Sequence, residues 1–268
     1  MCCRTATWSC SASMSEPMTT TTNSVPKAAL ITGGSRGIGA ACARLFAQQG
    51  YGVGIVCRKA KDQAEALAEE LAALGVPVKV YVCDVAQREQ VQAMTAAFLR
   101  EFGRIDVLVC NAGIARQELF TDITEASWRE VMGVDLDGVF YCAQAVLPDM
   151  LHRKAGKIIT LSSMWGQVGA SCEVAYSTAK AGVIGLTKAL AKELGPSGIT
   201  VNCVAPGVID TEMNGNLPQD IKDELAEETP LERLGTPEDV AQAVWFLASS
   251  AGDFFTGQIL APNGGLII

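Results

Sequence analysis

The stretch AALITGGSRGIGA, Ala28 to Ala40, decides the fold of this chain. Its first part, Ala28–Thr32, is an apolar run of strand length, and a helical pattern begins at Gly37. Gly33 permits a tight turn, Gly37 allows the backbone to approach a pyrophosphate, and Gly39 lets the helix pack against the strand. The helix N-terminus favours negative phosphates. Because the glycines stand in a strand–loop–helix context, the stretch predicts a dinucleotide site.

On either side of this stretch, apolar runs of strand length alternate with segments of helical period. Further strands are predicted at Gly52–Cys57, Val76–Cys83, Ile105–Cys110, Lys157–Leu161, Thr200–Ala205 and Gln258–Ala261. Helices are predicted over Gly37–Gln49, Ala60–Leu74, Gln87–Phe102, about Glu125 to about Leu151 with Thr124 as N-cap, Ala175–Leu194 and Pro237–Ser249. This order predicts an α/β, Rossmann-type doubly wound parallel sheet with helices on both faces. We expect one domain over residues 27–268, with a small polar lid near residues 212–229.

Composition and charge exclude several classes of protein. With 49% hydrophobic and 19% charged residues, the chain can bury a large core. Its net charge of −8 argues against non-specific binding to nucleic acid or to an anionic membrane. No apolar run approaches the roughly 18–20 residues that span a bilayer. We therefore expect a soluble protein.

The cysteines do not form the pattern of a disulfide framework or a zinc site. Seven stand singly in apolar segments: Cys42, Cys57, Cys83, Cys110, Cys142, Cys172 and Cys203. Isolated cysteines of this kind are typical of small buried hydrophobes in a reducing compartment. There is no CxxC pair, and the single histidine, His152, lies in a polar stretch typical of a solvated helix end. We expect no metal and a cytoplasmic location.

The first 26 residues differ from the rest of the chain. They are rich in Ser and Thr, have no periodic apolar pattern and lack the apolar segment of a secretory signal. They predict a disordered tail or a translation start at Met14 or Met18. A modifiable thiol at Cys2-Cys3 is the alternative.

The end of the second predicted strand distinguishes NAD from NADP. An NAD site usually places an acidic residue there to accept from the ribose 2′-hydroxyl. This chain has Cys57-Arg58-Lys59 instead, and Arg36 lies in the glycine-rich loop. Guanidinium groups pair with a 2′-phosphate through charge-assisted hydrogen bonds. Arg36 and Arg58 together therefore favour a site for NADP(H). The alternative is that Arg58 and Lys59 form only a solvated turn. Asp84 is placed to meet the adenine.

Tyr176 and Lys180 are four residues apart in a predicted helix, so their side chains share one face. Free tyrosine has a pKa near 10 and exchanges protons poorly at neutral pH. A nearby ammonium and the cationic nicotinamide of an oxidised cofactor favour the phenolate. Tyr176 can then act as general acid in ketone reduction and as base in reverse. Ser163, just past a strand end, is expected to hydrogen-bond the substrate oxygen.

Through these motifs, the chain from Lys27 to Ile268 resembles the short-chain dehydrogenase/reductase family. The matching motifs are Thr32-Gly33-x-x-x-Gly37-Ile38-Gly39, Asn111-Ala112-Gly113, Ser163, Tyr176-x-x-x-Lys180 and Pro206-Gly207. The resemblance implies one Rossmann domain with seven parallel strands, commonly a homotetramer assembled through two long central helices. It implies that Lys180 binds the ribose hydroxyls. The full cofactor set that we expect is Gly33, Ser35, Arg36, Gly37, Ile38, Gly39, Arg58, Asp84, Val85, Asn111, Ala112, Gly113, Tyr176, Lys180, Pro206, Gly207, Ile209 and Thr211.

One residue departs from the family pattern. The fourth catalytic residue of the family, an Asn in a V-N-L-x-G context, aligns with Asp135 in Val134–Gly138. That Asn normally bends a helix and holds a water that relays protons to the lysine. We expect Asp135 to keep this role, with a charge that alters the pKa of Lys180.

Within the family, the chain most resembles bacterial 3-oxoacyl-(acyl-carrier-protein) reductases, in residues 111–114, 176–182 and 256–258. This implies NADPH-dependent reduction of a 3-oxoacyl thioester to the 3-hydroxyacyl form, in fatty acid biosynthesis. Residues 165–209 also resemble a Firmicutes subgroup, some of whose members are regarded as elongation factor P 5-aminopentanone reductases.

Two features bear on the substrate, which we expect to contact Trp165 and Glu173. Gly195–Gly198 lacks the arginine with which carrier-protein reductases typically dock their partner, although Arg129, Arg153 and Lys154 remain. Glu173 stands where the family often has an uncharged pocket residue. Its carboxylate is suited to pairing with a substrate amine. The alternative is that Glu173 is a solvated loop residue. The 3-oxoacyl substrate is our first hypothesis and the aminoketone the second.

Two further readings remain. A non-catalytic NADP(H)-binding sensor or scaffold would be expected to lose the acid or its lysine, and this chain keeps both. Dehydrogenation of a sugar or polyol would give faster turnover with alcohol and NADP⁺ than with ketone and NADPH.

Overall fold

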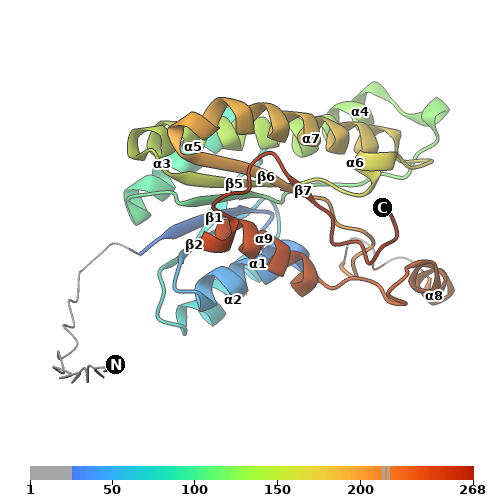
Figure 1. The fold of residues 1–268 in the computed structure, drawn as a ribbon, viewed down its shortest axis with the longest axis horizontal. Coiled ribbons are helices and arrows are strands. Elements are labelled where there is room, and N and C mark those ends of the chain that lie inside the picture. The colour runs from blue at the N-terminus through green and yellow to red at the C-terminus, as the bar shows by residue number, and fades with distance from the viewer. Residues whose placement is uncertain (1–25, 213–214, 216–217) are drawn as a thin grey trace, which may run out of the picture.

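The computed structural model describes residues 26–212, 215 and 218–268, and within them seven parallel strands form the central layer (Figure 1). The strands are β1 (Ala28–Thr32), β2 (Gly52–Cys57), β3 (Val78–Val82), β4 (Val107–Cys110), β5 (Gly156–Leu161), β6 (Ile199–Val204) and β7 (Ile259–Leu260). Their order in the sheet is β3-β2-β1-β4-β5-β6-β7. The predicted Rossmann-type fold is confirmed.

Helices cover both faces of this sheet (Figure 1). They are α1 (Gly37–Gln48), α2 (Lys61–Ala72), α3 (Arg88–Phe102), α4 (Glu125–Met132), α5 (Gly138–Arg153), α6 (Trp165–Val168), α7 (Val174–Leu194), α8 (Gln219–Glu228) and α9 (Pro237–Ala248). One face packs against α1, α2 and α9, and the other against α3, α5 and α7. No helix among the described residues is long and apolar enough to cross a bilayer.

The alternation of side chains along β1 explains why the sheet needs both layers. Ala29 and Ile31 belong to the core under α1, whereas Ala28 and Leu30 belong to the core under α3 and α5. All four are fully buried. Burying a leucine or isoleucine side chain contributes about 1.5–3 kcal/mol, so a strand apolar on both faces is stable only between two helix layers.

The strand order places a crevice at one edge of the sheet. Consecutive strands β1, β2 and β3 extend the sheet to one side, and β4 continues it on the other side of β1. The loops after β1 and β4 therefore diverge. In open α/β sheets ligands bind at this switch point, outside the carboxyl ends of the strands.

The prediction of one long helix from about Glu125 to about Leu151 is wrong in one respect. The structure divides it into α4, a π-helical segment at Gly133–Asp137, and α5. Thr124 is the N-cap, as predicted, in a capping box with Ser127. A π-helical turn holds an extra residue, and such turns occur frequently at functional sites.

Several other expectations are corrected. Two helices, α6 and α8, were not predicted, and α8 lies in the region expected to be a lid. Cys172 is half-exposed, with a φ of 61°, whereas the other six described cysteines are buried as predicted. Arg153 is engaged with Asp149 and Asp106 and is not available for docking a partner. The predicted tail falls almost wholly in residues 1–25, outside the described residues, as do residues 213–214 and 216–217 of the predicted lid.

Candidate active site

A pocket of about 960 Å³ lies at the carboxyl ends of the strands, between the loops that follow β1 to β6. All the predicted site residues line it except Gly39 and Asp135. Gly39 has a packing role, since a Cβ there would lie 2.2 Å from the Gly33 carbonyl oxygen. Asp135 lies behind the pocket wall, fully buried.

The glycine-rich loop has the shape that a dinucleotide phosphate requires. Gly33 and Gly37 have φ values of +63° and +52°, a region that favours glycine. The Gly34 N–H donates to the Val56 carbonyl at 3.0 Å, which ties the loop to β2. Helix α1 begins at Gly37 with no side-chain cap and no acidic residue in its first turn. Its N-terminal N–H groups therefore suit an anionic ligand in the pocket.

Asn111 fastens this loop to the end of β4. Its side-chain Nδ2 donates to the carbonyls of Thr32 and Gly33, both at 3.0 Å. In return, Thr32 Oγ1 accepts from the backbone N–H groups of Asn111 and Ala112 at 3.0 Å. The two loops that diverge at the switch point are thus locked together, a positioning role that the sequence pattern does not reveal.

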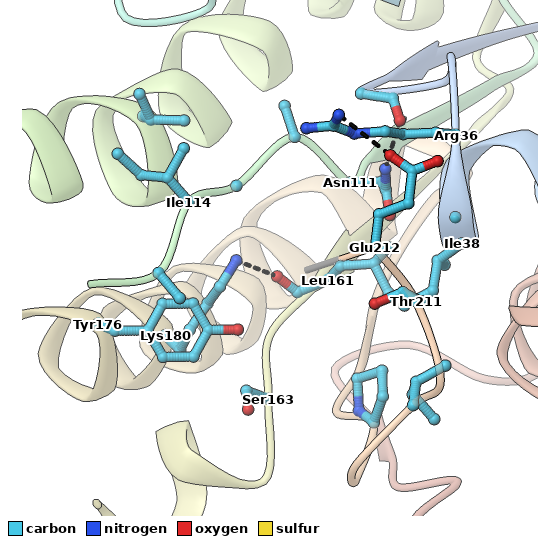
Figure 2. Close-up of a pocket in the computed structure, with 18 of the residues that line it drawn as sticks. Arg36, Ile38, Asn111, Ile114, Leu161, Ser163, Tyr176, Lys180, Thr211 and Glu212 are labelled. Atoms are coloured by element: carbon cyan, nitrogen blue, oxygen red, sulfur yellow. Dashed lines mark hydrogen bonds and ion pairs between the residues drawn. The ribbon is translucent and has the colours of Figure 1, made fainter. Parts of the chain in front are cut away.

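The far end of the pocket carries two arginines, each beside a carboxylate. Arg36 Nη1 lies 3.1 Å from Glu212 Oε2, and both side chains are exposed (Figure 2). Arg58 Nη1 lies 3.8 Å from Asp84 Oδ2. Glu212 was not predicted as a site residue, because nothing in the sequence links it to a loop far earlier in the chain.

Tyr176 and Lys180 lie on α7, and Lys180 Nζ is 5.5 Å from the centre of the tyrosine ring. Figure 2 shows the phenol hydroxyl directed into the pocket on the side where Ser163 lies. Ser163 follows β5, and its Oγ accepts from the Trp165 N–H at 3.2 Å. The structure therefore brings the predicted acid, its lysine and the predicted carbonyl-binding hydroxyl to one wall.

Lys180 is held behind this wall by one hydrogen bond and one ion pair. Its Nζ donates to the Leu161 carbonyl at 3.1 Å and lies 3.1 Å from Asp135 Oδ2. Asp135 Oδ1 accepts from the Ile114 N–H at 2.8 Å. The contact between carboxylate and ammonium is direct, with no atom between the two groups.

The electrostatics of Tyr176 combine opposing causes. Burial raises the pKa of Tyr176, and the charges of Asp135 and Glu173 add to that rise. Lys180 acts to lower the pKa of the phenol, as predicted, and a hydrogen bond with Ser163 acts in the same direction, but together they do not outweigh burial. Burial also acts to lower the pKa of Lys180, but Asp135 and Tyr176 outweigh it and the net direction is upward. In the absence of a ligand, both shifts favour the protonated forms of Tyr176 and Lys180.

The side of the pocket where substrate contacts were predicted is formed by two neighbouring loops. The Glu118 N–H donates to the Cys172 carbonyl at 2.8 Å, which joins the loop after β4 to the loop before α7. Trp165 and Glu173 both line the pocket here. Glu173 is half-buried, and burial raises its pKa, partly opposed by a hydrogen bond with Gln117. Glu173 is thus no freely solvated loop residue.

Sequence reasoning missed several pocket residues. Gln117 and Ile114 come from the loop after β4, and Ile221 and Leu225 come from α8. The apolar spacing of Ile221 and Leu225, four residues apart in a charged segment, is the signal by which α8 could have been found.

Comparisons with known proteins agree with this geometry. A family model described as Enoyl-(Acyl carrier protein) reductase matches residues 33–267. The 3-oxoacyl-(acyl-carrier-protein) reductase of Staphylococcus epidermidis is 44% identical over 240 residues, 90% of this chain and 98% of that protein. Its counterpart in Chlamydia muridarum is 42% identical over 245 residues, again 90% and 98%.

A solved structure gives the same result in three dimensions. The crystal structure of acetoin dehydrogenase from Salmonella typhimurium matches with a TM-score of 0.83 and 36% identity, over 90% of this chain and 96% of that one. The chain therefore belongs to the short-chain dehydrogenase/reductase family, oxidoreductases that act on a keto or CH–OH group with a nicotinamide cofactor.

Proposed function

We propose that this protein is an NADPH-dependent reductase that converts a 3-oxoacyl thioester on a carrier protein to the 3-hydroxyacyl form. The observation that carries this proposal is the meeting of Ser163, Tyr176 and Lys180 in the pocket that holds the glycine-rich loop. The substrate class rests on relatives that are named 3-oxoacyl-(acyl-carrier-protein) reductases and cover nearly the whole domain.

In the proposed reaction, Ser163 and Tyr176 hold the substrate oxygen between their hydroxyls. A bound nicotinamide cofactor supplies the hydride. Tyr176 gives its phenolic proton to the oxygen as negative charge develops there. Lys180, already bound to Asp135 and to the Leu161 carbonyl, keeps its third N–H for the pocket, where the ribose hydroxyls are expected. Its positive charge stabilises the phenolate that remains.

We propose NADP(H) rather than NAD(H) because cations gather at the far end of the pocket. Arg36, Arg58 and Lys59 line that end, around the expected position of the ribose 2′-substituent. The nearby carboxylates of Asp84 and Glu212 are partners that a phosphate can replace. A phosphate offers more charge and more acceptor oxygens than one carboxylate.

Three further proposals concern the assembly of the protein, its lid and the docking of a partner. We propose a homotetramer, a lid formed by the region of α8, and a carrier-protein partner that is met by exposed Arg129 and Lys154. Size-exclusion chromatography with light scattering measures the first of these. The carrier-protein partner is tested in the Arg129→Ala variant, by comparing its rates on acyl-carrier-protein thioesters with its rates on coenzyme A thioesters.

A second substrate class is favoured by Glu173. A half-buried carboxylate in the pocket, three residues before the acid, is suited to an ammonium group on the substrate. A protein-linked aminoketone, as in elongation factor P 5-aminopentanone reductases, carries such a group and an acyl thioester does not.

The two classes are separated by steady-state rates on a 3-oxoacyl thioester and on a protein-linked aminoketone. We expect Glu173→Gln to leave thioester reduction within about threefold of wild type, while Glu193→Gln, an exposed change on the same helix, changes neither. Wild-type preference for the aminoketone, lost selectively in Glu173→Gln, would reverse the assignment. Tight NADPH binding without turnover of any ketone would instead indicate a sensor.

A further inference from the structure

The buried pair of Asp135 and Lys180 has a consequence for the pH range of the enzyme. We propose that Asp135 is a positioning residue that balances the charge of Lys180 and so sets the pH at which the Tyr176–Lys180 pair loses its first proton. This inference rests on the function proposed above, in which Tyr176 is the acid. It concerns a residue that touches neither the pocket nor the substrate.

Both carboxylate oxygens of Asp135 face N–H groups. Oδ1 accepts from the Ile114 N–H, and Oδ2 faces the Lys180 ammonium. Both partners are donors. An asparagine has one acceptor oxygen and one NH₂ group, so it must turn a donor toward either Ile114 or Lys180.

The fit around the pair is tight. A Cβ on Gly113 would lie 2.8 Å from Asp135 Oδ2 and 3.2 Å from Lys180 Nζ, so a larger residue there would displace the ends of these two side chains. The π-helical segment between α4 and α5 carries Asp135 itself. The backbone of two elements therefore packs closely against this ion pair.

Few other charges surround the pair. The titratable or polar groups that influence Tyr176 or Lys180 are Glu173 on the N-terminal side of α7, Ser163 after β5, Asp135 on the π-helical segment, Cys203 on β6 and Cys110 on β4. Burial raises the pKa values of both thiols, so they stay neutral. Asp135 is then the nearest anion to Lys180, at 3.1 Å.

The sign of the effect follows from the net charge of the site. With Asp135 ionised, Lys180 protonated and Tyr176 neutral, these three residues together have no net charge. Loss of a proton from either Tyr176 or Lys180 then leaves a net negative charge in a site that is largely shielded from water, which is unfavourable. With asparagine at position 135, the same loss takes the site from positive to neutral. The first proton leaves at lower pH, whichever of the two groups releases it.

The test compares kcat/KM against pH for wild type, Asp135→Asn and Asp137→Asn, with NADPH and acetoacetyl-CoA. Asp137 lies two residues away on the same segment with its side chain exposed, so it is a matched control. Because reduction needs the protonated pair, we expect the ratio of neutral to alkaline rates to rise about tenfold in Asp135→Asn. Asp137→Asn should follow wild type. Coincident profiles for all three proteins would overturn the proposal.

A second measurement needs no turnover. The chain has four tyrosines, and subtracting the alkaline absorbance of Tyr176→Phe isolates the tyrosinate signal of Tyr176. Burial raises the pKa of Tyr81 to about 12, so that residue ionises late. We expect tyrosinate at position 176 to form at lower pH in the Asp135→Asn variant than in the wild type. An unchanged tyrosinate midpoint together with an unchanged rate profile would refute the inference.

Failure of the inference is distinguishable from failure of the proposed function. If Tyr176→Phe keeps wild-type rates, the acid is misassigned and the proposed function itself fails. If Tyr176→Phe is inactive and the Asp135→Asn profile does not move, only the role of Asp135 fails. Should Asp135→Asn not fold, as judged by circular dichroism, Asp135→Ser removes the same charge with a smaller side chain and carries the same expectation.

Discussion

Two ion pairs at the two ends of the pocket have the same length and opposite surroundings. Lys180 Nζ lies 3.1 Å from Asp135 Oδ2, with side chains 4% and 0% exposed. Arg36 Nη1 lies 3.1 Å from Glu212 Oε2, with side chains 59% and 57% exposed (Figure 2). Distance alone therefore says little about what an ion pair does. Water screens the exposed pair, whereas the buried pair has no other solvent for its charges.

The difference matches the chemistry proposed for each end. A proton-transfer group needs surroundings that do not rearrange, and the buried pair is held by the backbone of Ile114 and Leu161. A cofactor-recognition group must exchange partners when the cofactor binds, and an exposed arginine loses little by doing so. An ion pair between a cation and a carboxylate is thus permanent at one end of the pocket, whereas at the other end the cofactor can take the place of the carboxylate.

The largest effect is expected from Lys180→Met, which leaves Asp135 buried without its partner. Breaking a buried ion pair costs about 3–5 kcal/mol of unfolding free energy. Urea unfolding measures this loss, and Lys188→Met, an exposed change on α7, is the control. The double variant Lys180→Met/Asp135→Leu should regain most of the stability but no ketone reduction. Equal stability of Lys180→Met and Lys188→Met would mean that breaking the buried pair of Lys180 and Asp135 costs no more than an exposed change, against the description given above.

Tyr176→Phe should remove the proton donor and leave the packing intact. We expect NADPH oxidation with acetoacetyl-CoA to fall by about 10²–10⁴-fold, the usual range for general acid catalysis. Binding of NADPH, followed by fluorescence titration, should stay within about threefold of wild type. A large loss of NADPH binding would show that the hydroxyl serves the cofactor instead.

Arg58→Ala tests the exposed end of the pocket. A hydrogen bond to a charged group contributes about 1.5–3 kcal/mol, so we expect the Kd for NADPH to rise roughly tenfold to a hundredfold. The Kd for NADH, which lacks the 2′-phosphate, should hardly change. Arg100→Ala, an exposed change on α3, is the control. An equal loss for both cofactors would remove the argument for NADP(H).

The smallest effect is expected from Glu212→Gln, which frees Arg36 from its carboxylate. Exposed ion pairs contribute about 0–1 kcal/mol, so unfolding stability should stay within that range. The Kd for NADPH should fall by about twofold to fivefold at low salt, because the phosphate no longer competes with Glu212. The gain should shrink as salt is added, since salt screens exposed charges. A weaker binding of NADPH would instead give Glu212 a supporting role.

Local patterns were sufficient for most of the fold. Apolar runs predicted the seven strands within about two residues at each end. For the inner strands the reason is that a strand buried between two helix layers must be apolar on both faces. The helical spacing of Tyr176 and Lys180 placed both on one face of α7. The glycines of the first loop were predictable for a similar reason, since their backbone angles depend on the residue itself.

The sequence by itself determined which groups are available: the sheet, the glycine-rich loop, the acid with its lysine, and a carboxylate at position 135. Only the tertiary structure decided how two of them are paired. Asp135 meets Lys180 because a π-helical segment and Gly113 bring separate elements together. Arg36 meets Glu212 because the loops after β1 and β6 end at the same edge of the sheet. Such contacts depend on the packing of distant segments and on exclusion of water, and neither is written in the local order of residues.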